Sequence, residues 1–170
     1  MIVRFTPGAT TFRPFLHRAR GVKIGKGVFI ADDVYIDGEY PEMVEIQEGA
    51  AVSIRATIIA HNKGPGRVII EKGALIGPQA VVLCSSGKIL RIGEGAVVGA
   101  GCVVSRNVPA RTVLIPAPNQ VAGHAMVSLV AAETIEEFWA GLRPLPRKPA
   151  TSQSNPGVRV VDDSPGQAAD

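Results

Sequence analysis

The chain has 170 residues, which is the length of one domain or of one domain with a tail. Hydrophobic residues make up 46% and aromatic residues only 5%, so a core must be built mainly from aliphatic side chains. Eighteen basic and fifteen acidic residues leave a net charge of +3. The basic residues are scattered, with no aromatic platform beside them, which argues against a nucleic acid partner.

The N-terminal segment, residues 1–21, has no long apolar run and no small-residue cleavage site, so we do not expect a secretory signal. We expect this segment to cap the following domain through Phe12, Phe15 and Leu16. No stretch of the chain reaches the roughly 20 apolar residues of a membrane span. The only two cysteines lack the spacing of a metal or redox motif. These features predict a soluble, cytoplasmic protein.

From residue 22 onward the sequence repeats with a period of six. A helix repeats at 3.6 residues and a plain strand at 2, so neither explains this period. Very short strands that turn a corner every six residues do explain it, because three repeats then close one triangular coil and stacked coils form a parallel β-solenoid. The twelve repeat positions, all Ile or Val, are Ile24, Ile30, Ile36, Ile46, Val52, Ile58, Ile70, Ile76, Val82, Ile92, Val98 and Val104.

Three longer steps of ten, twelve and ten residues separate these positions into four groups of three. The additional residues therefore leave from the same corner on three successive coils. Loops held on a rigid scaffold are common places for functional residues, so we look for the site at this corner.

Beyond the repeat, Thr134 and Glu137 form a capping box at the start of an apolar helical pattern. This predicts a short C-terminal α-helix within residues 124–142. Residues 143–170 contain five prolines and many polar residues, and we interpret them as a flexible tail.

The six-residue pattern resembles that of the hexapeptide-repeat acyltransferases, most closely over residues 22–113. The segment IGEGAVVGAGCVVSRNVPARTVL, residues 92–114, is similar to the terminal coil of the maltose and galactoside acetyltransferase branch. The resemblance implies an all-β solenoid, a left-handed parallel β-helix over residues 22–123, assembled as a homotrimer with active sites between subunits. It also implies an O-acetyltransferase that uses acetyl-CoA, and no metal, to acetylate a hydroxyl of a sugar or similar small acceptor.

The resemblance assigns the role of general base to His61, in the second corner loop. A neutral imidazole suits this role because its ordinary pKa is about 6.5. The alternative is an ordinary surface histidine. His17 precedes the repeat and His124 follows it, and neither is an equal candidate.

Four residues near His61 are candidates for binding the acceptor: Asp37, Glu39, Asn62 and Cys84. Asp37 either binds substrate hydroxyls or orients His61, unless it is an ordinary turn aspartate before Gly38. A thiol beside a histidine would allow a covalent acyl-enzyme. The family transfers directly to the acceptor, so we interpret Cys84 as a bystander or a wall of the site.

Acetyl-CoA requires small residues along its pantetheine and basic residues at its phosphates. The candidates from the family motif are Pro78, Gly99, Ala100, Gly101 and Arg106. Gln120 and Gly123 replace arginines that help to bind the cofactor in the family, and Lys88, Arg91 and Arg111 are the candidates to substitute for them. Corner geometry alone is an alternative explanation of the glycines.

Three other functions remain as alternatives. The first is N-acylation of an amino sugar or another amine. The second is a non-enzymatic scaffold or binding protein with the same coil. The third is a carbonic anhydrase of the γ class, which requires three histidines converging on a metal, whereas the coil holds only His61.

Overall fold

The structure is a computed structural model that describes residues 7–118, 123–128, 130–131 and 133–144. The described residues divide into two compact units, one ending at Pro116 and the other beginning at Ala117. The predicted solenoid range of 22–123 extends beyond the end of the first unit. The predicted tail lies outside the described residues from residue 145 onward.

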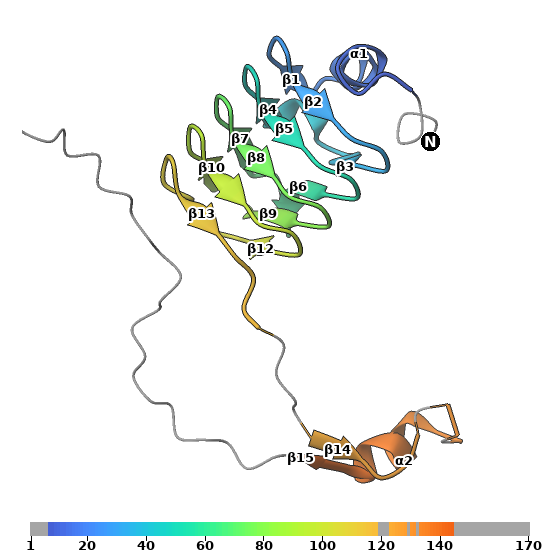
Figure 1. Ribbon diagram of the computed structural model, residues 1–170. Coiled ribbons are helices and arrows are strands. Elements are labelled where there is room, and N and C mark those ends of the chain that lie inside the picture. Colours follow the sequence, from blue (N-terminus) through green and yellow to red (C-terminus); the bar gives the residue numbers. More distant parts are fainter. Residues whose placement is uncertain (1–6, 119–122, 129, 132, 145–170) are drawn as a thin grey trace, which may run out of the picture. The chain divides into compact units, whose positions relative to one another are not determined.

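The first unit is a solenoid of three parallel sheets, which confirms the fold predicted from the six-residue period (Figure 1). Each of four coils contributes one strand to each sheet, a further turn adds a fifth strand to sheet B, and equivalent strands of successive coils pair in parallel. Sheet A contains β1 (Lys23–Ile24), β4 (Val44–Ile46), β7 (Arg67–Ile70) and β10 (Ile89–Ile92). Sheet B contains β2 (Phe29–Ile30), β5 (Ala51–Val52), β8 (Leu75–Ile76), β11 (Val97–Val98) and β13 (Val113–Leu114). Sheet C contains β3 (Tyr35–Ile36), β6 (Thr57–Asn62), β9 (Val81–Ser85) and β12 (Val103–Val104).

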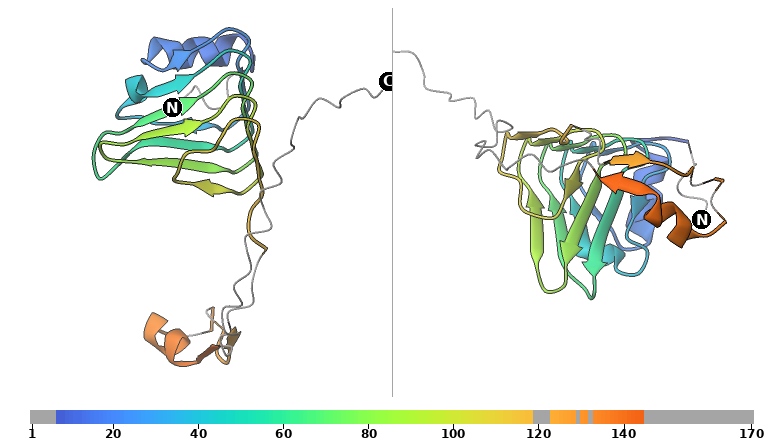
Figure 2. Two further views of the ribbon diagram at one scale, coloured as in Figure 1. Left: turned by 90° about the vertical axis from the view of Figure 1, so that its left-hand side faces the viewer. Right: turned by 90° about the horizontal axis from the view of Figure 1, so that it is seen from below.

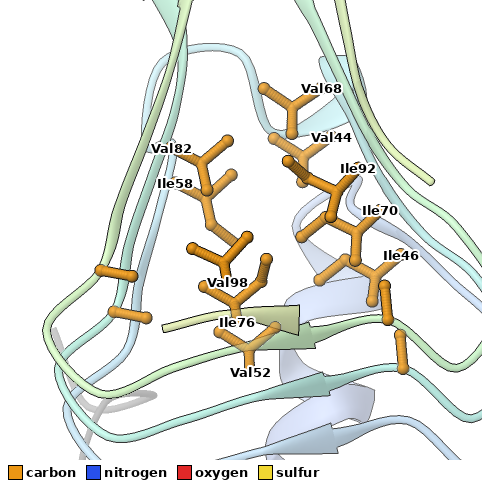
Figure 3. Close-up of a cluster of buried hydrophobic side chains, with 14 of the residues drawn as sticks. Val44, Ile46, Val52, Ile58, Val68, Ile70, Ile76, Val82, Ile92 and Val98 are labelled. Atoms are coloured by element: carbon orange, nitrogen blue, oxygen red, sulfur yellow. The ribbon is translucent and has the colours of Figure 1, made fainter. Parts of the chain in front are cut away.

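The core is the set of repeat positions that point into the coil. Of the twelve Ile and Val positions, eleven are buried, and Ile24 in the first coil is partly buried. Figure 3 shows side chains from all three sheets meeting inside the solenoid. β-Branched side chains suit such short strands, and each coil buries its aliphatic surface against the coils beside it.

The additional corner residues mainly lengthen strands. β6 has six residues and β9 has five, whereas β3 and β12 have two. β7 and β10 each have four residues on the other side of the same corner. The chain therefore extends outward as paired strands at this corner, which lies between sheets C and A (Figure 2).

Helix α1 (Phe12–Ala19) precedes the first coil and contacts β1 and β2. The prediction that Phe12 and Phe15 are its packing residues is wrong, because they are 48% and 57% exposed. The buried residues are Arg13, Pro14 and His17.

The open edge of the first coil explains the polar face of α1. Strand carbonyls at a sheet edge need donors. Arg18 donates to Ile24 O and Gly25 O, at 3.0 and 2.6 Å. Arg13 donates to Ile30 O, and Arg20, just after the helix, donates to Ile36 O at 2.7 Å. One arginine therefore binds the last carbonyl of each of β1, β2 and β3.

The second unit contains β14 (Gly123–Ala125), α2 (Ile135–Ala140) and β15 (Leu142–Pro144). β14 and β15 pair antiparallel. The hydroxyl of Thr134 accepts a hydrogen bond from Glu137 N at 3.2 Å, which confirms the predicted helix and its N-cap. Within the described ranges, no helix has the length and apolar character needed to cross a membrane.

Candidate active site

Asp37 follows β3 directly and is completely buried. Its Oδ1 accepts hydrogen bonds from the backbone N–H groups of Glu39 and Tyr40, at 3.0 and 3.1 Å. This arrangement folds the chain over the aspartate and leads into the short 3₁₀ helix η2 (Pro41–Met43). Its Oδ2 accepts from Ala60 N at 2.8 Å, in the next coil. Three backbone donors therefore fix the carboxylate.

His61 lies near the end of β6, in the part of the strand that extends past its coil. Strand alternation buries Ile58 and Ala60, whereas the side chain of His61 is on the outer side and 29% exposed. Ile36 pairs with Ile58 in the sheet, so Asp37 and His61 meet across neighbouring coils. His61 Nδ1 is 2.5 Å from Asp37 Oδ2.

This contact defines the tautomer of His61. Hydrogen bonds from His61 and from the backbone of Tyr40, Ala60 and Glu39 outweigh the opposing effect of burial and lower the pKa of Asp37. The ionised carboxylate only accepts, so Nδ1 carries the proton and donates it to Asp37. Nε2 of the neutral ring then has a free lone pair. The hydrogen bond to Asp37, with the negative charges of Asp37 and Glu39, raises the pKa of His61 above 6.5.

The Nε2 side of His61 is bordered by Glu39 and Tyr40. The Glu39 carboxylate is 72% exposed, and its Oε2 is 3.5 Å from Nε2. The rings of Tyr40 and His61 have centroids 5.6 Å apart and planes tilted by 53°. A substrate whose hydroxyl or amine group approaches Nε2 would therefore contact the Glu39 carboxylate and the Tyr40 ring. Asn62, the next residue, is exposed.

Two predicted acceptor-binding residues occupy other places. Complete burial excludes Asp37 from direct contact with an acceptor and leaves it the predicted orienting role. Cys84 is 1% exposed on the inner side of β9, and its thiol is 3.2 Å from Lys88 O. The sequence placed Cys84 correctly near Ala60, but strand alternation turns both inward and His61 outward. We therefore remove Cys84 from the acceptor-binding residues.

A cavity of about 330 Å³ lies at the same corner, toward the end of the solenoid. It contains the predicted Arg106 together with Lys88, which supply two cations. Its lining residues are Cys84, Ser85, Lys88, Ile89, Leu90, Ser105, Arg106 and Asn107. Sequence reasoning missed Ser85, Ser105 and Asn107, because only the stacking of β9 on β12 brings these segments together.

The remaining predicted cofactor residues lie at other corners. Pro78 and Gly99–Gly101 are stacked between sheets B and C, where Gly101 N donates to Pro78 O at 2.9 Å. Arg111 lies between sheets A and B and has a φ of 57°. A Cβ on Gly99 would come within 2.6 Å of Leu114 O, and Gly101 has a φ of 69°. Close packing on Leu114 O thus requires glycine at position 99, whereas the φ at position 101 favours glycine without requiring it, because Arg111 has a similar φ.

A metal site finds no support in the described ranges, where no group of three or more His, Cys, Asp and Glu side chains is close enough to hold an ion. His17 is buried under the first coil, and His124 lies in the second unit. The three converging histidines of the carbonic anhydrase alternative are not formed within this part of the chain.

Comparison with known proteins finds similarity to acetyltransferases. No protein-family model and no solved structure matches the chain. The 2,3,4,5-tetrahydropyridine-2,6-dicarboxylate N-acetyltransferase of Staphylococcus aureus (strain bovine RF122 / ET3-1) is 36% identical over 100 residues, 59% of this chain and 38% of the relative. YvoF of Bacillus subtilis (strain 168), provisionally named as an acetyltransferase, is 32% identical over 117 residues, 64% of this chain and 63% of YvoF.

The chain thus spans less than two thirds of the length of these relatives. This protein is a hexapeptide-repeat β-solenoid that is similar, over more than half of its length, to acetyltransferases.

Proposed function

We propose that the protein is a CoA-dependent acetyltransferase in which His61 is the general base. The observation that carries this proposal is the Asp37–His61 contact of 2.5 Å, which leaves Nε2 as a partly exposed base. The acceptor is a hydroxyl of a sugar or a similar small molecule. The similarity to acetyltransferases supports acetyl-CoA as the donor.

The geometry accounts for each proton. The acceptor hydroxyl donates to Nε2 while its oxygen attacks the thioester carbonyl, and the proton moves to His61. The C–S bond then breaks, and the departing sulfur takes this proton, which regenerates neutral His61. Asp37 remains ionised and stabilises the imidazolium between the two steps.

The cavity with Lys88 and Arg106 is the proposed place for the CoA phosphates. Two cations and the hydroxyls of Ser85 and Ser105 are suitable donors for phosphate oxygens. The small residues Gly99–Gly101, with Pro78, remain candidates for contact with the pantetheine, and Arg111 remains a further candidate for phosphate. That the protein belongs with the maltose and galactoside acetyltransferase branch is also part of this proposal.

We further propose a homotrimer with active sites between subunits. The outer side of sheet B is apolar along its entire register: Phe29, Ala51, Leu75, Val97 and Val113. The corresponding register of sheet A, by contrast, contains the charged residues Lys23, Glu45 and Arg91. An apolar column of this kind is typical of a surface that is covered in an assembly.

Acylation of an amine is the second candidate function. Glu39 supports it, because a carboxylate 3.5 Å from Nε2 is suited to bind an ammonium group beside the base. The similarity to an N-acetyltransferase gives additional support.

The test measures thiol release from acetyl-CoA with a panel of sugars and amines, for wild type, His61→Ala and the control His124→Ala. We expect acceptor-dependent turnover that falls by roughly 10²–10⁴-fold in His61→Ala, because general base catalysis is worth about that much. His124→Ala should keep the wild-type rate. The acceptor that is used decides between O- and N-acylation.

Equal rates for wild type and His61→Ala would show that His61 is not the base. If no acceptor is turned over, calorimetric titration with CoA separates two outcomes. Binding of CoA would mean that the acceptor lies outside the panel. Absence of binding would favour the scaffold alternative.

A further inference from the structure

Arg20 connects α1 with the strand end that carries Asp37. Its guanidinium donates to Ile36 O at 2.7 Å and to Asp37 O at 3.4 Å. These two carbonyls flank the Cα of Asp37, so holding them restrains the backbone angles that direct its carboxylate. The same guanidinium lies close enough to Asp37 for their charges to interact.

His17 holds Arg20 from the other side. It is 1% exposed, and its Nδ1 is 3.1 Å from Arg20 Nη2 and 3.3 Å from Arg20 Nε. Burial, followed by the charges of Arg20 and Arg13, lowers the pKa of His17 to about 4. His17 is therefore neutral at pH 7. Because arginine only donates, Nδ1 must be the acceptor. A buried neutral imidazole is a fixed acceptor that orients the planar guanidinium.

The contacts form one continuous path from the helix to the base. His17 orients Arg20, Arg20 holds the carbonyls on both sides of the Asp37 Cα, and the Asp37 carboxylate receives Nδ1–H of His61. The loop donors Glu39 and Tyr40 fix the other oxygen of the carboxylate. The carboxylate is thus restrained through its backbone as well as through its oxygens.

We infer that Arg20, oriented by His17, is a positioning residue for the Asp37–His61 pair, so that α1 forms part of the active-site machinery as well as a cap on the solenoid. The inference rests on the proposed function. It assigns a role that extends beyond the base and its immediate partner, because Arg20 reaches His61 only through Asp37.

Arg18 provides a matched control for the capping role. Arg18 lies in the last turn of α1, two residues before Arg20, and its guanidinium also binds two successive carbonyls, those of Ile24 and Gly25. These carbonyls end β1, in sheet A, whereas Asp37 follows β3 in sheet C. Arg18→Ala therefore removes the same charge and the same kind of hydrogen bonds as Arg20→Ala, without touching Asp37.

The experiment measures the pKa and tautomer of His61 by NMR titration of ¹⁵N-labelled imidazoles in wild type, Arg20→Ala, Arg20→Lys and Arg18→Ala. The charged or titratable groups that face His61 are Asp37, Glu39 and Tyr40, and Arg20 and His61 face Asp37. We expect the pKa of His61 to fall toward 6.5 in Arg20→Ala, because a less ordered carboxylate holds the imidazolium less well. Loss of the Arg20 charge acts in the opposite direction, so Arg20→Lys, which keeps the charge, gives the comparison without this second effect. Arg18→Ala should keep the wild-type value.

Steady-state kinetics gives the second readout. Loss of orientation should reduce kcat roughly tenfold in Arg20→Ala and leave the KM for acetyl-CoA within about twofold. Arg20→Lys retains the charge but cannot bind both carbonyls and His17 with one planar group, so we expect an intermediate kcat. If Arg20→Ala does not fold, the same comparison with wild type and Arg18→Ala is made with Arg20→Lys and His17→Phe. His17→Phe removes the nitrogen that accepts the hydrogen bond of Arg20.

The two proposals fail in different ways. An unchanged His61 pKa in the Arg20 variants, or an equal shift in Arg18→Ala, would overturn the positioning role and leave Arg20 as a structural cap. A selective shift in the Arg20 variants, with no turnover of any acceptor and no binding of CoA, would confirm the network and contradict the transferase.

Discussion

Asp37 and His61 form a buried carboxylate and a partly exposed imidazole that share one hydrogen bond. Burial of the carboxylate is tolerated because three backbone N–H groups and Nδ1–H satisfy it. The cost of its desolvation is therefore met by hydrogen bonds that also fix its direction. The outcome is an imidazole with one defined tautomer and a pKa above 6.5.

Asp37→Asn tests this pair at the residue scale. The neutral amide removes the charge that raises the pKa of His61, so this pKa should fall toward 6.5 and kcat should decrease by roughly 10²–10⁴-fold. Since the base must be neutral, kcat/KM of the wild type should decline as the pH falls through the raised pKa. In Asp37→Asn the decline should occur at a lower pH. A pH–rate profile measures this.

Glu42→Gln is the control for Asp37→Asn, because it removes one negative charge from η2 in the same loop and Glu42 is exposed. Its profile should match that of the wild type. If the acid limb of Asp37→Asn lies at the wild-type pH, Asp37 does not set the pKa of the base.

At the scale of the elements, two kinds of glycine hold the corners. Gly77 follows β8, and a Cβ there would come within 2.6 Å of Val98 O and 2.8 Å of Ala100 N in the next coil. Gly73 has a φ of 64° and nothing within 4 Å of an added Cβ. Gly77 permits neighbouring coils to stack closely. Gly73 contributes only the positive φ of its corner, because an added Cβ would have free space there. Gln79, with a φ of 57°, shows that a non-glycine residue occupies a corner of the second kind.

We therefore expect Gly77→Ala to destabilise the protein more than Gly73→Ala. Gly73→Ala adds only conformational strain of roughly 1 kcal/mol. Gly77→Ala must push apart the backbones of two coils, which should cost several kcal/mol, as other severe packing changes do. Thermal unfolding followed by circular dichroism measures both. A Tm for Gly77→Ala at or above that of Gly73→Ala would contradict the stacking argument.

At the scale of the whole molecule, the length of the coils decides where the candidate site lies. Register partners in successive coils of sheet A are 22, 24 and 22 residues apart, as in Ile24–Ile46, Ile46–Ile70 and Ile70–Ile92. Three repeats of six would use 18 residues, so each of these three coils has additional residues, and all of them lie at one corner. This corner holds Asp37, His61 and the cavity with Lys88 and Arg106, whereas sheet B presents an apolar outer column.

Leu75→Arg tests the proposed assembly through this column. A charge in the middle of an apolar contact surface carries a large desolvation cost, so we expect the variant to be a monomer where the wild type is a trimer. Size-exclusion chromatography with light scattering measures the mass. Val103→Arg is the control, because Val103 is 73% exposed on sheet C, outside this column, and should leave the trimer intact. A monomeric wild type, or a trimeric Leu75→Arg, would contradict the proposed interface.

The sequence by itself determined the solenoid and the corner that carries the additional residues, whereas the proposal of His61 as the base comes from the family resemblance. The solenoid and its corner depend on a local pattern, because Ile or Val recurs at the inward position of every six-residue repeat and the additional residues interrupt this period at one place in the coil. The helix at residues 135–140 likewise follows from its own capping residues.

Only the tertiary structure decided which side chains meet. Asp37 and His61 are 24 residues apart and pair because β3 and β6 stack in register. The inward direction of Cys84 follows from alternation along the extended β9, and the polar face of α1 follows from the unpaired carbonyls at the edge of the first coil. The six-residue period predicts which corners stack on one another. The contacts of each side chain at such a corner, however, depend on how far the strands extend beyond the coil and which way each side chain points, and the period does not contain that information.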